Sequence, residues 1–285
     1  MDASILAERS RAALAGSRFA DVRWVAETGS TNADALELAR QGAPEGIVLV
    51  AEHQTAGRGR LGRTWQAPSG ASLLCTVLLR PYGRVAPSTT MAVAVAAADA
   101  VAELTGQAPR LKWPNDLVWP GDGSGPDRKL AGILAEVDWP VASTVASGWS
   151  EPKPSDRLVV AVGIGINVAW GADVPADLAD SAVALDHLTQ PAAPPDRVDL
   201  LVAFLRHLDR RYGALSAGPD GAAELRADWR ERSATIGRQV RVDLGTDDLV
   251  GTAVDVTAEG HLVVETLEGD RRTIAVGDVV HLRPL

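Results

Sequence analysis

The sequence predicts an α+β protein in which a large mixed domain precedes a small β-barrel. The length of 285 residues suits one large domain followed by a small one. Up to residue 235, apolar strand-like runs are interspersed with segments of helical period. After Ile236 the period changes to short alternating strands, which are separated by the turns GTDD, TAEG and EGDR. We therefore expect two domains, over 1–235 and 236–285.

The composition excludes several classes of function. A formal net charge of −9 argues against a general binder of nucleic acid or of anionic membranes. The single cysteine, Cys75, excludes a disulfide framework and a cysteine zinc site, and its apolar run LLCTVLL predicts a buried position. No metal-ligand spacing of histidine or carboxylate residues is present. No apolar stretch reaches 18 residues, and charges interrupt the N-terminal MDASILAERSRAAL, which predicts a cytoplasmic protein without a membrane span.

The first half of the chain alternates between helices and strands. The patterns predict helices over 4–15, from GSTN (29–32) to Gly42, and over 88–104. They predict strands over 19–27, 46–52 and 71–80, and the last of these is apolar enough to be buried on both faces. Thr31 and Asp34 form a capping-box pattern at the start of the second helix.

The second half adds three long strand-like runs and two helices. Strands are expected over 110–119, 128–139 and 157–170. The joiner PGDGSGPD (120–127) is a loop by composition, 141–156 is expected to be a mobile surface loop, and 171–195 is expected to be irregular. Apolar residues spaced three and four apart predict an amphipathic helix over 198–215, with a further helix over 220–232.

The stretch GRGRLGRT (57–64) imitates two nucleotide loops. It has the spacing of GxGxxG and nearly that of a P-loop, but Pro68 and Gly70 prevent the helix that both motifs require. Its glycines cost conformational entropy and its three arginines repel one another. A solvated basic turn is the simpler alternative, yet a loop that closes on an anion explains this concentration of charge better.

Four other clusters are candidates for a site, and each has a structural alternative. KWPNDL (112–117) presents an amide and a carboxylate at a strand turn, or is only a polar turn behind a tryptophan. Lys129 enters an apolar strand, or reaches back to water. GIGIN (163–167) leaves one strand face bare for a flat ligand, or for tight packing. GSTN offers spare hydroxyl and amide groups, or only starts a helix.

Taken together, these motifs resemble the biotin protein ligase family. STN, AEHQTAGRGRLGRTW, KWPNDL, RKLAGIL and GIGIN occur in the order and spacing of that family, and the resemblance covers about residues 20–285. It implies a mixed-sheet catalytic domain of the biotin/lipoate ligase type with a C-terminal SH3-like β-barrel. Only about twenty residues precede the first expected catalytic strand, so the resemblance is to bacterial members without the N-terminal DNA-binding domain.

The resemblance implies a two-step reaction. Biotin and ATP give biotinyl-adenylate and pyrophosphate, and biotin then passes to a lysine of a biotin carboxyl carrier domain of a biotin-dependent carboxylase. ATP and biotin are thus the expected substrates, with Mg²⁺ as the expected ion. The implied assembly is a monomer or a weak ligand-dependent homodimer, with neither nucleic acid nor membrane as a partner. A lipoate–protein ligase and a non-catalytic biotin-binding regulator remain as alternatives.

The resemblance also implies roles for particular residues. The expected biotin-binding residues are Ser30, Thr31, Asn32, Gln54, Gly57, Arg58, Gly59, Arg60, Lys129 and Gly132. The expected ATP-binding residues are Arg63, Trp65, Asn115, Lys129 and Asn167. Catalysis is expected from Lys129, Arg60 and Asp116. We expect the loop GRGRLGRT to act as a lid that closes only on captured anions. Residues around 57–66 should therefore be poorly ordered or displaced without ligand.

Overall fold

The computed structural model describes most of the chain. The described residues are 2–120, 126–139, 151–171, 174, 178–245, 248–275 and 277–282. The loop expected over 141–156 lies largely outside them, as does most of the joiner 120–127. Within the described residues, no helix is both long enough and apolar enough to cross a membrane.

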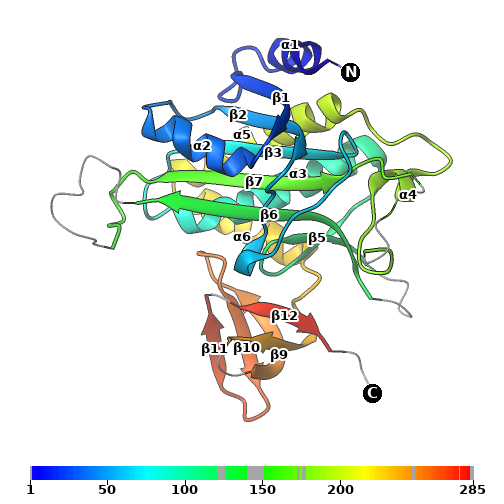
Figure 1. The fold of residues 1–285 in the computed structure, drawn as a ribbon. Coiled ribbons are helices and arrows are strands. Elements are labelled where there is room, and N and C mark those ends of the chain that lie inside the picture. The colour runs from blue at the N-terminus through cyan, green and yellow to red at the C-terminus, as the bar shows by residue number, and fades with distance from the viewer. Residues whose placement is uncertain are drawn as a thin grey trace.

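A seven-stranded mixed sheet forms the centre of the large domain. Its strands are β1 (Val22–Thr28), β2 (Val48–Gln54), β3 (Ser72–Leu79), β4 (Arg110–Lys112), β5 (Asp116–Trp119), β6 (Arg128–Asp138) and β7 (Val159–Asn167). They lie in the order β1-β2-β3-β7-β6-β5-β4 (Figure 1). β1 and β2 are parallel, and the other neighbours are antiparallel. The predicted α+β class and mixed sheet are therefore confirmed.

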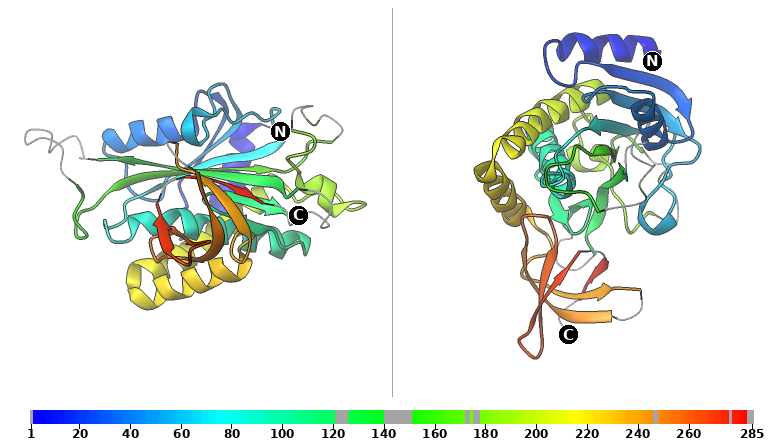
Figure 2. Two further views of the ribbon diagram at one scale, coloured as in Figure 1. Left: turned by 90° about the horizontal axis from the view of Figure 1, so that it is seen from below. Right: turned by 90° about the vertical axis from the view of Figure 1, so that its left-hand side faces the viewer.

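Helices cover both faces of this sheet. They are α1 (Ala3–Ala13), α2 (Thr31–Arg40), α3 (Thr89–Thr105), α4 (Leu185–Thr189), α5 (Arg197–Ala217) and α6 (Pro219–Arg232). α2 lies on one face against β3 and β7, while α3, α5 and α6 lie on the other (Figure 2). Every residue of β3 is buried, because both faces of this central strand are covered. The apolar run predicted to be buried on both faces is confirmed.

Three local predictions are wrong. The segment 171–195, expected to be irregular, contains the short helix α4. Thr31 and Asp34 do not form a capping box, because Ser30 is the N-cap of α2 and makes no side-chain cap bond. Instead, the Asp34 carboxylate accepts a hydrogen bond from Thr28 of the preceding strand. The run 110–119 is also not one strand: it folds back at the cis Trp113–Pro114 bond and gives the antiparallel pair β4 and β5.

The C-terminal domain is a small five-stranded barrel. Its strands are β8 (Gln239–Asp243), β9 (Asp248–Val256), β10 (Leu262–Thr266), β11 (Arg271–Ile274) and β12 (Asp278–His281), in the order β11-β10-β9-β8-β12. Four strand-like runs were expected, and the last of them divides into β11 and β12. Alternate apolar side chains such as Val240 and Val242 are fully buried, which is the pattern that the period of two predicts.

Hydrogen bonds and polar contacts attach the barrel to the large domain beneath β5 and β6 (Figure 1). The indole of Trp113, in the β4–β5 turn, donates to the carbonyl of Gly260 at 2.9 Å. The hydroxyl of Ser88 donates to the carbonyl of Ala258 at 2.8 Å. The imidazole of His281 contacts the carboxylate of Asp127, which lies immediately before β6. These contacts bring the end of the barrel carrying β12 against the candidate site.

Candidate active site

A cavity of about 400 Å³ lies between β6, β7, the barrel and the loop GRGRLGRT (57–64), which we call the arginine loop. It brings together most of the residues that the sequence singles out. Its lining includes Ser30, Thr31, Asn32, Gln54, Arg58, Gly59, Arg60, Arg63, Trp65, Asn115, Asp116, Lys129 and Gly132. Five described lining side chains are cationic and two are anionic. The cavity is therefore suited to a negatively charged ligand.

The arginine loop is folded over this cavity. Arg58 and Thr64 form an antiparallel bridge, and the amide of Trp65 donates to the carbonyl of Gly57 at 3.0 Å. Between them runs a short 3-10 turn in which Leu61 has a left-handed φ of 55° and an exposed side chain. Neither a Rossmann helix nor a P-loop helix follows, as predicted. Side chains outside the loop contact it, and its order in the absence of ligand stays a prediction.

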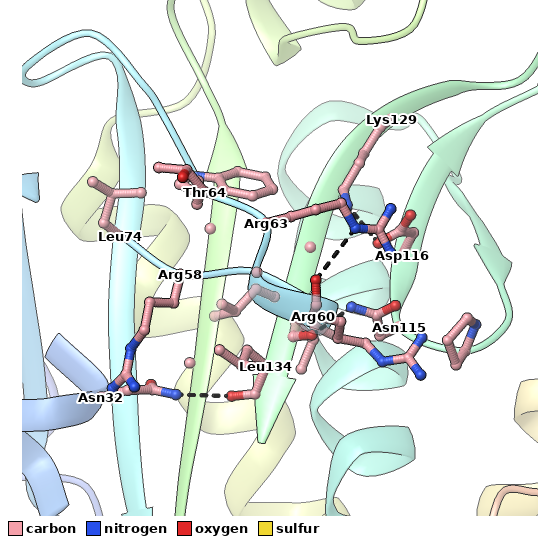
Figure 3. A pocket seen from close by; sticks show the side chains of 18 of the residues that line it. Asn32, Arg58, Arg60, Arg63, Thr64, Leu74, Asn115, Asp116, Lys129 and Leu134 are labelled. Atoms are coloured by element: carbon pink, nitrogen blue, oxygen red, sulfur yellow. Dashed lines mark hydrogen bonds and ion pairs between the residues drawn. The ribbon is translucent and has the colours of Figure 1, made fainter. Parts of the chain in front are cut away.

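Carboxylates from two distant elements hold the loop's arginines. Arg58 pairs with Glu136 of β6 at 3.1 Å. Arg60 and Arg63 both pair with Asp278 at the start of β12, the Arg60 contact measuring 3.2 Å. In Figure 3, Arg58 points toward Asn32, whereas Arg60 and Arg63 lie at the opposite side of the cavity. The loop is thus anchored at one end to the sheet and at the other to the barrel.

Burial lowers the pKa of Arg60, the middle arginine of the loop. Desolvation lowers the pKa of Arg60, and the nearby charge of Arg63 acts in the same direction. Asp278 and Asp116 oppose this shift. An arginine remains protonated at neutral pH even after such a shift. Arg60 therefore carries a positive charge at a place where water screens it poorly.

One end of the cavity is lined mainly by neutral side chains that are rich in hydrogen bonds. The Gln54 amide oxygen accepts from the Thr31 backbone amide at 2.8 Å and from its hydroxyl at 3.0 Å. Thr76 of β3 donates toward the Thr31 hydroxyl and the Asn32 amide oxygen, at 2.8 and 2.6 Å. The Asn32 amide in turn donates to Glu136 at 2.8 Å. Thr31 and Asn32 therefore do more than start a helix, and their positions depend on their neighbours.

Sequence analysis did not identify Thr76 and Glu136. Thr76 is a completely buried hydroxyl within the apolar strand LLCTVLL. A polar group in such a strand needs a hydrogen-bond partner, and this requirement is a signal that could have marked it. Glu136 lies near the end of β6 with no motif around it. Only the pairing of β6 beside β7 places its carboxylate next to the arginine loop.

Lys129 and Asp116 form the other end of the cavity. The ammonium group of Lys129 lies 2.7 Å from the Asp116 carboxylate and 5.4 Å from the centre of a Trp65 ring. Asp116 begins β5 just after the turn at Trp113–Asn115, and the side-chain amide of Asn115 donates to the carbonyl of Ile133 at 2.7 Å. KWPNDL is therefore a turn that presents polar groups to the cavity, as predicted.

A strip of glycines forms the floor between the two ends. A Cβ atom added at Gly132 would lie 2.8 Å from the Trp65 ring, and one at Gly165 would lie 2.6 Å from it. A Cβ atom at Gly163 would instead clash with the Asn32 side chain. The bare strand face that GIGIN predicts is thus present, and the flat group lying on it is the Trp65 indole. The Nε1 of this indole is buried without a hydrogen-bond partner among the described residues.

Two predicted site residues do not line the cavity. Asn167 is buried behind it and donates to the carbonyls of Lys129 and Val183, at 3.3 and 3.1 Å. Its structural contribution is to hold the strand that carries Lys129. Gly57 lies on a second cavity of about 370 Å³ on the other side of Trp65. A nucleotide role for Asn167 and a biotin role for Gly57 stay predictions.

Cys75 lies in the wall of the cavity but is not suited to nucleophilic chemistry. It is completely enclosed, and burial raises the pKa of its thiol to about 12. The reactive form of a cysteine is the thiolate, which is scarce at neutral pH with such a pKa. The predicted buried position is therefore confirmed, and the chemistry of the cavity depends on its cations and amides.

Comparison with known proteins first defines the class. The model of the biotin/lipoate A/B protein ligase family matches residues 25–146, and the model of the biotin protein ligase C-terminal domain matches residues 235–282. Both match where the fold has its mixed sheet and its barrel. The fold and cavity are thus those of a biotin/lipoate ligase class of enzyme.

Individual relatives narrow this class. A biotin–[acetyl-CoA-carboxylase] ligase of Mycobacterium tuberculosis is 38% identical over 277 residues, which are 94% of this chain and 92% of that one. The bifunctional ligase/repressor BirA of Bacillus subtilis is 31% identical over 85% of this chain and 69% of its own. The structure of an Aquifex aeolicus biotin protein ligase in complex with biotin and ATP superposes with a TM-score of 0.72 at 25% identity, covering 93% of this chain and all of that chain. The chain belongs to the biotin protein ligase family, as its motifs predict.

The glycine floor allows a direct test of the position of Trp65. We expect Gly165→Ala to push the indole off the strip, because the added methyl would overlap the ring. Such overpacking costs roughly 1–3 kcal/mol of stability. The measurement is tryptophan fluorescence, which should shift to longer wavelength as the ring becomes hydrated. The same substitution in a Trp65→Phe background controls for the other tryptophans, and an equal shift there would contradict the packing described.

Proposed function

We propose that this chain is an ATP-dependent biotin–protein ligase. It forms biotinyl-5′-AMP from biotin and ATP, then transfers biotin to a lysine of a biotin carboxyl carrier domain. The observation that carries the proposal is the division of one cavity into an end lined mainly by neutral hydrogen-bonding side chains and an end where several cations gather. Biotin has the same division, with a cyclic urea at one end and a carboxylate at the other.

The mainly neutral end is the proposed site of the biotin head group. Ser30, Thr31 and Gln54 line it, and their hydroxyl and amide groups match a urea, which both donates and accepts hydrogen bonds. Asn32 lies beside them, fixed by Thr76 and Glu136. The bare backbone at Gly132 allows the Trp65 indole and the Lys129 side chain to lie close to the floor beside this end.

The cationic end is the proposed site of the reacting groups. In the first step a carboxylate oxygen attacks the α-phosphorus and pyrophosphate leaves, so two anions must meet. Lys129, Arg60 and Arg63 supply the positive charge that offsets their repulsion. Groups already held in place give most of this stabilisation, because they need no reorganisation during the reaction. The ion pairs of all three with Asp278 or Asp116 support such preorganisation.

Asp116 is the proposed partner of Lys129 in both steps. In the structure it fixes the ammonium group at 2.7 Å. In the second step the incoming lysine must lose a proton as it attacks the mixed anhydride and AMP leaves. A carboxylate at this position would orient that amine and stabilise its positive charge. Asn115 precedes Asp116 in the same turn and is proposed, with Arg63, Trp65 and Asn167, to contact the nucleotide.

Mg²⁺ is the expected ion of the reaction. The described residues contain no group of three or more histidine, cysteine, aspartate or glutamate side chains that would cage a metal. Nucleotide enzymes commonly bind Mg²⁺ through one or two carboxylates together with phosphates and water. Asp116 is the carboxylate of the cavity that we propose to serve it. When bound, the ion would neutralise part of the phosphate charge.

The partner of the second step is proposed to be the carrier domain of a biotin-dependent acyl-CoA carboxylase. The similar Mycobacterium tuberculosis and Paracoccus denitrificans ligases are both named for acetyl-CoA carboxylase.

We further propose a monomer or weak ligand-dependent homodimer in the cytoplasm, with neither nucleic acid nor membrane as a partner. The net charge of −9 supports the last point. We also propose the domain boundary between 235 and 236.

The direct test supplies biotin or lipoate with ATP and a carboxylase carrier domain. We expect transfer of biotin alone, with one pyrophosphate released per biotin activated. Exclusive transfer of lipoate would instead support a lipoate–protein ligase. Binding of biotin without any biotin-dependent release of pyrophosphate would support a non-catalytic regulator.

We expect Lys129→Ala to slow adenylate formation at least about a hundredfold, because removal of one preorganised charge from a reacting centre has effects of this size. Biotin-dependent pyrophosphate release is the measurement, with circular dichroism to verify the fold. Lys153→Ala is the control, since Lys153 is exposed and does not line the cavity. Pyrophosphate release near the wild-type rate from a folded Lys129→Ala protein would contradict the assigned role.

We expect Arg60→Ala to weaken retention of the adenylate. Arg60 is the most buried of the loop's arginines and lines the end of the cavity proposed for the phosphate of the adenylate, so its loss should weaken closure of the lid. Free biotinyl-adenylate should then accumulate in solution about tenfold or more above the wild-type level, a change that corresponds to about 1.4 kcal/mol. Chromatography of the filtrate measures it. Unchanged retention would argue against the loop as a lid.

A further inference from the structure

The carboxylate of Asp278 occupies an unusual position in the charge pattern of the cavity. It lies in the barrel, yet it lines the cavity of the large domain and pairs with two arginines of the loop. Each of its oxygen atoms meets a different guanidinium group. Arg60 also donates to the neighbouring carbonyl of Gly277 at 3.2 Å. The two arginines that the reaction requires for phosphate are therefore already bound to a protein anion.

A carboxylate and a phosphate present similar acceptors to a guanidinium group. Both offer paired anionic oxygens that match its planar fork of donors. Arg60 and Arg63 each contact Asp278 through one terminal nitrogen. A triphosphate bound at the same guanidinium groups would compete with Asp278 for these donors and would be repelled by its charge.

We propose that Asp278 is a positioning residue that holds the arginine loop closed over the cavity until the triphosphate of ATP takes its place. This inference rests on the proposed function, because it assigns the exchanged anion to ATP. The exchange also releases the loop from the barrel, so nucleotide occupancy is sensed across the boundary between the two domains. Arg58 does not take part, because its partner Glu136 belongs to the sheet.

The barrel has other attachments that do not involve Asp278. Trp113 donates to Gly260, and Arg226 pairs with Asp255 at 2.6 Å. His281, three residues after Asp278, contacts Asp127 and Thr235. A variant without the Asp278 charge should therefore keep its fold and its domain arrangement. Changes in its ligand affinity can then be attributed to loss of that charge.

The test is Asp278→Asn, which removes the charge and keeps the size. We expect ATP with Mg²⁺ to bind about three- to tenfold more tightly, because two partly exposed ion pairs no longer compete with it. We expect biotin without ATP to bind at least about threefold more weakly, because the lid is no longer held. Isothermal titration calorimetry measures both constants, and Asp278→Glu, which restores the charge, should lie nearer to wild type in each.

Asp248→Asn is the matched control. Asp248 is also a barrel carboxylate paired with an arginine, Arg241, but it does not line the cavity. Its substitution should change neither constant. Opposite shifts for the two ligands in Asp278→Asn support the proposal, and any other pattern overturns it, including loss of both affinities or no change in either. Pyrophosphate release by the wild-type protein is measured in parallel, so failure of the proposed function is seen there and not in the variant.

Discussion

The arrangement of the active site depends on how three neighbouring guanidinium groups are neutralised. Arg58, Arg60 and Arg63 lie within six residues, and an isolated loop of this kind would repel itself. The structure separates them: one pairs with a sheet carboxylate and two pair with a barrel carboxylate. This division folds the loop across the cavity and joins the two domains. The same charges that stabilise the closed loop are those that an anionic substrate needs.

Much of the fold could be predicted because its signals are local. The buried strand at Ser72–Leu79 and the helix at Arg197–Ala217 follow directly from hydrophobic period. The change of period after Ile236 predicts the barrel in the same way. The motif residues of the site could also be identified, since their type and order are unusual. What these local patterns share is that a short stretch of sequence contains the whole physical reason for the structure.

The remaining features depend on contacts between distant segments. Thr76, Glu136 and Asp278 contact the loop or the side chains of Thr31 and Asn32, yet each stands in an ordinary strand sequence. Local reasoning even misassigned Asp34, whose carboxylate bonds to a neighbouring strand and not to its own helix. The partners of the arginine loop are equally distant in the sequence. Its glycines and charges favour disorder by themselves, and the carboxylates that pair with its arginines come from β6 and β12.

The position of the loop also depends on steric contacts between Trp65 and the distant glycines of β6 and β7. Because Gly132 and Gly165 lack Cβ atoms, the Trp65 indole can lie on the sheet beside Lys129. Any larger residue at either glycine would raise the indole, and the loop that carries it, away from the lysine. The position of the loop is therefore set from two sides, by charge at its arginines and by steric room beneath its tryptophan. A closed lid over Lys129 requires both, since ion pairs alone would not exclude water from the floor, and excluding water is what protects a hydrolysable adenylate.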